Sequence, residues 1–207
     1  MAKKGTTKYK SNLQEKSVAK QFGGKQVIAS GALWFAHSDV RNDKFLIECK
    51  TTEKDFYTIT AKVWEKIQNE ATKDNLREPL LIIDLHDNEK ERYVCFPYYM
   101  VNDIETPQWL KCNIETARGE SKQFRFYGVR KHCATVVQFQ KTKKKYGCHT
   151  VVLMTIKDFK RLCDEKLFYT LNEGDEPECT LCQYNVEDTG VCEDCNHGNK
   201  FVLAEED

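Results

Sequence analysis

Two carboxylates and one ammonium group, those of Asp39, Glu48 and Lys50, interrupt what is otherwise a good pair of short β-strands in the first third of this 207-residue chain. Apolar side chains recur at every second position over residues 45–50, and this period of two predicts a β-strand with Glu48 and Lys50 on one face. A turn-forming Asn-Asp pair precedes that strand, so a hairpin would place Asp39 beside Glu48. The sequence therefore predicts that Asp39, Glu48 and Lys50 converge.

A group of this kind suits the hydrolysis of phosphodiester bonds. Mg²⁺ prefers oxygen ligands and commonly binds proteins through only one or two carboxylates. Such an ion lowers the pKa of a bound water and clamps a phosphate, while a nearby lysine offsets charge that develops on phosphorus. The alternative interpretation is a solvated hairpin face that carries three ordinary charges.

Four features of the chain, taken in order, resemble a known nuclease family. They are Glu15 in an early helix, a Ser30-Gly31 segment, Asp39 before an apolar residue, and the run Glu48-Cys49-Lys50. From about residue 13 to residue 85 the chain resembles the PD-(D/E)XK nuclease superfamily, and within it the archaeal-type Holliday junction resolvases and their phage relatives. The proline that gives the superfamily its name is absent, because Ser38 precedes Asp39.

The resemblance carries specific expectations about chemistry. It implies that Glu15, Asp39 and Glu48 hold a catalytic Mg²⁺ or Mn²⁺ ion and that Lys50 is catalytic. It also implies a metal-dependent DNA endonuclease, most similar to Holliday junction resolvases of phage or mobile-element type that act in DNA recombination. Branched DNA, a four-way junction, would then be the partner, and two symmetric nicks would need a homodimer. The alternatives are another restriction or repair nuclease, or a catalytically silent zinc-ribbon adaptor that binds nucleic acid or protein.

The predicted elements follow an α/β (α+β mixed) order. Ser11 with Gln14 is typical of a capping box that opens a helix, and apolar residues at helical spacing predict another helix over residues 61–74. A buried strand is expected over residues 80–85, with a hairpin partner at 92–97. These elements suit a central mixed sheet flanked by helices, which the resemblance makes a restriction-endonuclease-like core.

The chain beyond residue 97 matches the family poorly. Further strands are expected over residues 124–129, 134–140 and 148–155, followed by a short helix over 157–165. We expect its larger aromatic residues to lie in the core rather than to stack on bases: Trp109, Phe124, Phe126, Tyr127 and Phe139.

Charge is distributed unevenly although the formal net charge is zero. Of 32 acidic and 32 basic residues, eleven acidic residues and one basic residue lie from Glu173 onward, so residues 1–172 carry a net charge of about +10. A basic body can bind a phosphate backbone. The candidate DNA contacts are Ser30, Ser38, Lys54, Lys143, Lys144 and Lys145. Turn formation by the serines and protection of a sheet edge by the lysine-rich loop remain alternative roles.

Four cysteines form a second candidate site near the C-terminus. Cys179 and Cys182 make one Cys-x-x-Cys pair, and Cys192 and Cys195 make another after nine intervening residues. Four thiolates at this spacing predict a structural tetrahedral Zn²⁺ site, a small zinc ribbon whose folding the metal would drive. A redox-active pair is the alternative. We therefore divide the chain into a nuclease-like domain over residues 1–172, with its core at about 11–97 and a β-rich part at 98–172, and an acidic tail over 173–207.

Compartment and cofactors follow from what the sequence lacks. The basic N-terminus has no apolar stretch behind it, and no apolar run approaches the length of a membrane span, so we expect a cytoplasmic protein with no membrane contact. Six further cysteines are scattered singly, which fits a reducing compartment. No phosphate-cradling glycine loop is present, so no nucleotide cofactor is expected.

Overall fold

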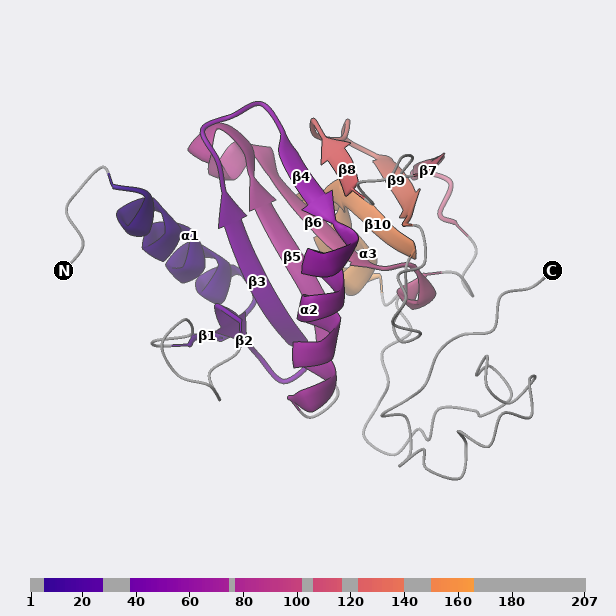
Figure 1. Ribbon diagram of the computed structural model, residues 1–207. Coiled ribbons are helices and arrows are strands. Elements are labelled where there is room, and N and C mark those ends of the chain that lie inside the picture. The colour runs from indigo at the N-terminus through magenta and orange to yellow at the C-terminus, as the bar shows by residue number, and fades with distance from the viewer. Residues whose placement is uncertain are drawn as a thin grey trace, which may run out of the picture.

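A broad sheet with helices on both faces forms the body of the computed structural model (Figure 1). The structure describes residues 6–27, 38–74, 77–101, 106–116, 123–139 and 150–165. Its helices are α1 (Thr7–Gln21), α2 (Ala61–Lys73) and α3 (Ile156–Asp164), with 3-10 turns at Leu85–Asp87, Glu89–Glu91 and Tyr98–Met100. Its strands are β1 (Lys25–Gln26), β2 (Val40–Arg41), β3 (Phe45–Thr51), β4 (Tyr57–Thr60), β5 (Glu78–Asp84), β6 (Arg92–Pro97), β7 (Lys111–Thr116), β8 (Gln123–Phe126), β9 (Cys133–Gln138) and β10 (Thr150–Thr155).

The main sheet mixes parallel and antiparallel pairs. Its order is β1-β2-β3-β5-β6-β10-β9-β7, in which β2 runs antiparallel to β3 and β3 runs parallel to β5. The chain between β3 and β5 contains α2, as a parallel connection requires. Strands β4 and β8 pair separately as a two-stranded ribbon. The expected fold class, a mixed α/β arrangement with a central sheet flanked by helices, is confirmed.

Helix starts depend on threonine caps. The hydroxyl of Thr60 accepts the backbone N–H of Val63 at 3.1 Å and so begins α2, in agreement with the expected helix. Helix α1 begins earlier than expected, because the Thr6 hydroxyl accepts the N–H of Tyr9 at 3.3 Å. The expected capping box at Ser11 is therefore wrong, since this residue lies inside the helix.

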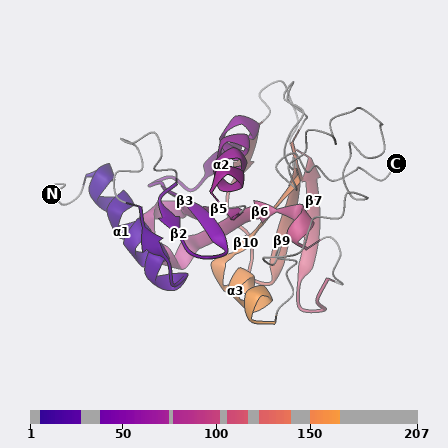
Figure 2. The ribbon, with the colours of Figure 1, turned by 90° about the horizontal axis from the view of Figure 1, so that it is seen from below.

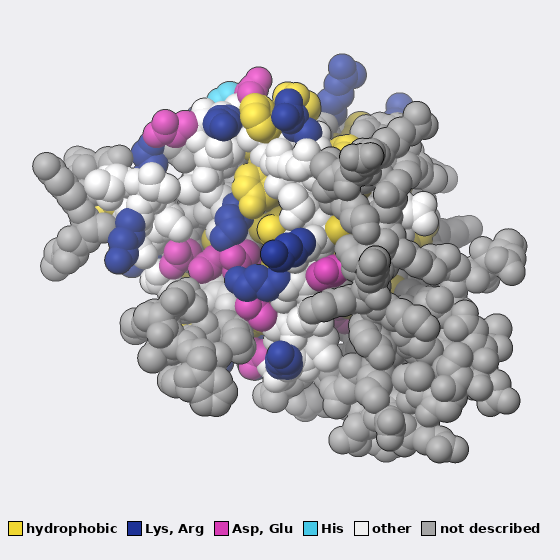
Figure 3. All heavy atoms as spheres, viewed as in Figure 1, with side chains coloured by type: hydrophobic (Ala, Val, Ile, Leu, Met, Phe, Trp, Pro, Cys, Tyr) yellow, Lys and Arg dark blue, Asp and Glu magenta, His cyan; other side chains and the backbone are white. Residues whose placement is uncertain are grey.

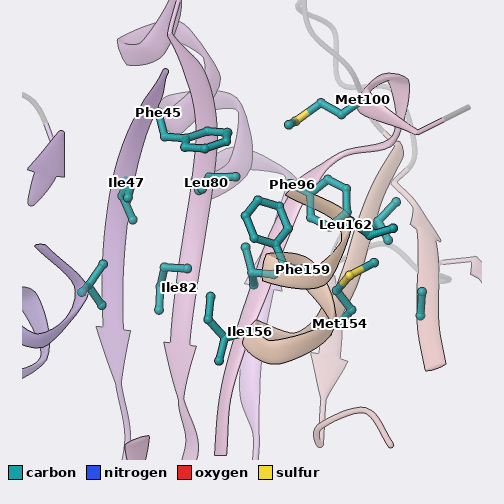
Figure 4. Packing of buried hydrophobic residues seen from close by; sticks show 14 of the residues in the cluster. Phe45, Ile47, Leu80, Ile82, Phe96, Met100, Met154, Ile156, Phe159 and Leu162 are labelled. Atoms are coloured by element: carbon teal, nitrogen blue, oxygen red, sulfur yellow. The ribbon is translucent and has the colours of Figure 1, made fainter. Parts of the chain in front are cut away.

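Two apolar layers lie on opposite faces of the sheet. On one face α1 and α3 cover the sheet, and in Figure 2 they lie on the side away from α2. Phe159 of α3 is central to this layer, with its ring 5.1 Å from that of Phe96 and 6.0 Å from that of Phe45 (Figure 4). On the other face α2 and the β4–β8 ribbon pack on the sheet through fully buried side chains that include Trp64, Ile59 and Phe126.

A buried ion pair ties α1 to the sheet. Asp84 at the end of β5 and Arg92 at the start of β6 form two charge-assisted hydrogen bonds of 2.7 Å, and their side chains are 4% and 3% exposed. A guanidinium nitrogen of Arg92 also donates to the Ser17 hydroxyl and the Gln21 side-chain carbonyl of α1, each at 3.0 Å. This network fixes the position of the helix that carries Glu15.

The later strands agree in part with expectation. Strands β8, β9 and β10 and helix α3 are present near the expected positions, although β8 and β9 begin one residue earlier and end three and two residues earlier than expected. Strands β4 and β7 were not anticipated. Phe126 and Phe139 are buried as expected. The expectation for Tyr127 is wrong, because the residue lies just past the end of β8 and is 61% exposed. Within the described residues, no helix combines the length and apolar character needed to cross a membrane.

Candidate active site

The hairpin of β2 and β3 brings Asp39, Glu48 and Lys50 together. The backbone N–H of Asp39 donates to the carbonyl of Ile47 at 3.0 Å, which places Asp39 immediately before β2 and beside β3. One carboxylate oxygen of Asp39 accepts the backbone N–H of Cys49 at 2.8 Å. On β3, the ammonium of Lys50 lies 2.6 Å from a carboxylate oxygen of Glu48. The predicted hairpin and the shared face of Glu48 and Lys50 are confirmed.

Glu48 is buried to a degree that is unusual for a charged side chain. Glu48 is 9% exposed, because β3 is an interior strand and Glu48 lies opposite Leu81 of β5 in the register. The intervening Cys49 is 2% exposed and points into the opposite apolar layer, as the alternation predicts. Ionised carboxylates are rarely buried unless a cation or hydrogen-bond donors compensate them.

The electrostatics of the site show that its charges interact. The pKa of Asp39 is raised from 3.8 to about 6, first by burial and then by the charge of Glu48, while the hydrogen bond from the Cys49 N–H and the charge of Lys50 oppose the rise. Burial lowers the pKa of Lys50, but attraction to Glu48 outweighs this and the net shift is upward. Lys50 therefore stays protonated at neutral pH, while two adjacent carboxylates repel each other. A divalent cation would relieve that repulsion.

Glu15 lies at the edge of this group. Its charge contributes to the raised pKa of Asp39, so it lies within electrostatic range of the site. Both of its oxygens already accept hydrogen bonds, one from the Ser11 hydroxyl at 3.1 Å and the other from the Gln26 amide at 2.5 Å. Among the residues that the structure describes, no group of three or more His, Cys, Asp or Glu side chains is arranged to hold a metal. The expected set of three metal ligands is therefore not brought into one group, and Asp39 and Glu48 are the two carboxylates that the hairpin places side by side.

Tyr57 and Gln14 also belong to this site, although the sequence did not lead us to expect them there. Tyr57 of β4 is half-buried, and burial raises the pKa of its phenol, with Lys50 opposing the rise and Glu48 adding to it. Gln14 of α1 is 3% exposed and donates from its amide to the carbonyl of Lys50 at 2.9 Å. The side-chain carbonyl oxygen of Gln14 is buried without a hydrogen-bond partner in the described part of the chain. The sequence signal for Tyr57 was the alternation of Tyr57, Thr58 and Ile59, which indicates a strand but is too short to be recognised alone.

The candidate DNA contacts are only partly described. Ser38 is 5% exposed, has a left-handed backbone with φ of 59°, and donates to the Glu70 carboxylate of α2 at 3.4 Å. Its hydroxyl therefore serves the contact between hairpin and helix. Lys54 is exposed, with its ammonium 5.4 Å from the centre of the Phe56 ring. Outside the described residues lie Ser30, Lys143, Lys144, Lys145 and the candidate zinc ligands Cys179, Cys182, Cys192 and Cys195.

Acidic and basic side chains mix on the surface over these elements. Figure 3 shows acidic side chains gathered between α1 and α2, with basic side chains beside them.

Comparisons of the chain with protein-family models, with curated proteins and with solved structures give no match.

Proposed function

We propose that this protein is a Mg²⁺- or Mn²⁺-dependent DNA endonuclease, most similar to a Holliday junction resolvase of phage or mobile-element type, with a restriction-endonuclease-like core. The observation that carries the proposal is the pairing of the adjacent carboxylates of Asp39, which is partly buried, and Glu48, which is 9% exposed, with the ammonium of Lys50 2.6 Å from Glu48. A carboxylate whose pKa is raised by burial and by a neighbouring carboxylate is typical of functional sites rather than of solvated surface.

The residues present fit the proposed ion. Asp39 and Glu48 would hold it, because ionised carboxylates are acceptor-only oxygen ligands. When bound, the ion supplies Lewis acidity and a water of lowered pKa. Lys50 supplies a fixed positive charge near the scissile phosphate and offsets negative charge in the transition state. The main-chain carbonyl of Lys50 is held by Gln14, and the hydrogen bond from Cys49 fixes the orientation of Asp39.

The choice of DNA as substrate depends on charge. Residues 1–172 carry about +10, which favours a polyanion and predicts salt-sensitive binding. A four-way junction and a homodimer come from the family resemblance in the motif, and the zinc ribbon would support protein contacts or docking on the basic body. Another structure-selective nuclease with the same two-carboxylate site is the second candidate, because the site specifies bond cleavage and not DNA shape.

Nicking assays with the full-length chain test the proposal. A four-way junction, a flap and a plain duplex of matched sequence are incubated with Mg²⁺, and with EDTA as the metal-free control. We expect Glu48→Gln and Lys50→Ala to lower the cleavage rate at least ~100-fold, as the loss of one transition-state contact does elsewhere. Lys157→Ala, an exposed lysine on α3 beyond the opposite face of the sheet, is the matched control and should cleave normally.

The results separate the candidates. Preferential cleavage of the junction supports a resolvase, while equal or greater cleavage of the flap or duplex supports the other nuclease. If the native protein and the Glu48 and Lys50 variants cleave alike, or if none cleaves any substrate, the catalytic assignment is wrong and a binding adaptor is favoured.

A further inference from the structure

The β4–β8 ribbon has two chemically different faces. Tyr57 pairs with Phe126 and Ile59 pairs with Phe124 in its antiparallel register, and these side chains point toward the sheet. Because successive residues of a strand alternate in direction, the neighbours of these residues point outward. The residues on this outer face are Phe56, Thr58, Thr60, Gln123, Arg125 and Tyr127.

An aromatic and cationic patch occupies one end of the outer face. Phe56 and Tyr127 come next in the register after the Tyr57–Phe126 pair, and their ring centres lie 5.7 Å apart. The guanidinium of Arg125 lies 4.7 Å from the centre of the Phe56 ring, and the ammonium of Lys54 lies 5.4 Å from it. We call Lys54, Phe56, Arg125 and Tyr127 the ribbon patch. Cations and aromatic faces at these distances attract each other, so the patch is held in place before any ligand binds.

Exposure argues that the ribbon patch does more than cover the ribbon. Tyr127 is 61% exposed, the largest exposed fraction among the large apolar residues of the described part of the chain. Lys54 and Arg125 are exposed as well. Figure 3 shows hydrophobic and basic side chains side by side over the start of β4 and the end of β8. An exposed aromatic ring beside cations is the combination on which unpaired bases stack while their phosphates are neutralised.

The local charge favours a polyanion. Glu53 is engaged by Lys10, and Asp55 is the other acidic residue in the same turn. Against these stand Lys10, Lys54 and Arg125, and the exposed Arg130 and Lys131 follow Tyr127 closely along the chain. Within the ribbon patch itself the two charged residues, Lys54 and Arg125, are both basic, which suits contact with a phosphate backbone.

The ribbon also connects the patch to the candidate active site. Tyr57, adjacent to Phe56 in β4, faces inward and interacts electrostatically with Lys50 and Glu48. One face of this short ribbon is thus directed toward the candidate active site, and the other face toward solvent. We propose that the ribbon patch binds a single-stranded DNA segment, with an unpaired base stacked on Tyr127 and its phosphates held by Arg125 and Lys54. The single strand would be one that is exposed at a branch point of the substrate. The identity of this partner therefore rests on the proposed nuclease function.

Binding measurements test this proposal separately from cleavage. The full-length Lys50→Ala protein in EDTA is titrated into a fluorescent oligo-dT strand and into a blunt duplex, so that no cutting occurs. Adding Tyr127→Ala should weaken binding to the single strand roughly 5- to 100-fold, the effect of losing one base–aromatic stack. Binding to the duplex, whose bases are already paired, should change little. Tyr127→Phe keeps the ring and should bind normally.

Two further variants sharpen the test. Tyr98→Ala removes an aromatic residue that is 38% exposed outside the ribbon and should not alter binding. Arg125→Gln should lower the dependence of log affinity on log salt by about 0.7 for the single strand, which is one phosphate contact. Equal affinity of the Tyr127→Ala and parent proteins for the single strand, or an equal loss for strand and duplex, overturns the proposal.

The outcomes remain distinguishable from those of the nuclease test. Loss of single-strand binding in Tyr127→Ala would establish the patch even if no substrate were cleaved. Cleavage that depends on Lys50 but binding that is indifferent to Tyr127 would retain the nuclease and eliminate the patch.

Discussion

The carboxylate of Asp39 accepts the backbone N–H of Cys49 at 2.8 Å, so a side chain continues the pairing of β2 with β3 beyond the two residues of β2. Asp39 therefore has two separable properties. It is an acceptor that orders the hairpin, and it is a charge whose burial and closeness to Glu48 raise its pKa to about 6. Replacement by asparagine keeps the first property and removes the second.

Asp39→Asn should stabilise the metal-free protein. The folded-state pKa lies above the ordinary value of 3.8, so the folded state binds a proton more readily and ionised Asp39 opposes folding above about pH 6. Removing the charge should raise the free energy of unfolding at about pH 8 by on the order of 1–2 kcal/mol, less than the full shift implies because the group is partly solvated. The gain should disappear below about pH 4.

Urea denaturation in EDTA measures this difference. Asp43→Asn, an exposed change in the turn of the same hairpin, is the matched control and should have little effect. A lower stability of Asp39→Asn at every pH would show that the charge is compensated and would remove the main argument for a metal site.

The buried pair of Asp84 and Arg92 should be strongly coupled. Arg92→Leu leaves the carboxylate of Asp84 buried without its partner and should lower the free energy of unfolding by about 3–5 kcal/mol. The double variant Asp84→Leu/Arg92→Leu should recover much of that loss, because no uncompensated charge remains. Arg161→Gln breaks the exposed pair with Glu165 and serves as the control. A cost for Arg92→Leu no greater than that of the control would contradict the assignment.

Glu78 should make stability depend on pH. Burial raises the pKa of this carboxyl from 4.5 to about 7, although the hydroxyl of Tyr99 donates to it and lowers the value. The folded state therefore holds the proton over the window between these values, and its contribution to stability is complete below about pH 4.5 and lost as the pH rises through about 7. The limiting slope for this group is about 1.4 kcal/mol per pH unit.

Glu78→Gln should flatten the stability profile in that window. Thermal or urea unfolding of the native and variant proteins across the window measures the difference directly. Parallel profiles for the two proteins would mean that Glu78 titrates normally in the folded state.

The four C-terminal cysteines should bind one zinc ion per chain. Metal analysis of the purified protein should give a stoichiometry near one, and Cys182→Ser should lower it because a tetrahedral site would lose a thiolate ligand. Cys163→Ser, which changes one of the scattered cysteines, is the control and should leave the zinc content unchanged. Zinc that remained bound in Cys182→Ser would rule out this ligand set.

Local sequence patterns predicted the elements that carry the site. The alternation around Glu48 specified both the strand and the face, because one face of β3 packs in an apolar layer. Helix α2 was evident because its buried residues, Trp64, Ile67 and Ala71, recur at helical spacing. Nothing in the sequence opposed these assignments.

Other features depend on contacts between distant segments. The β4–β8 ribbon joins residues 57–60 to residues 123–126. A strand near β8 was expected, but β4 carries too few alternations to be recognised alone, and no local pattern indicates that the two strands pair. The hydrogen bond from Gln14 to the Lys50 carbonyl depends on how α1 packs on the sheet. That packing is fixed by Arg92 of β6, which donates to two side chains of α1. Tyr127 is exposed because β8 ends at Phe126, the residue before it. Such relationships arise from tertiary packing and leave little trace in local composition.

The parallel pairing of β3 with β5 also constrains the order in which the protein can fold. The hairpin that carries Asp39, Glu48 and Lys50 is local in sequence, whereas β5 can join β3 only after the segment containing α2 has closed a large loop. In the earlier stage the carboxylates approach each other in water, where solvent and salt screen their repulsion. We therefore expect the cost of desolvating them to arise mainly when β5 joins β3, and not when the local hairpin forms.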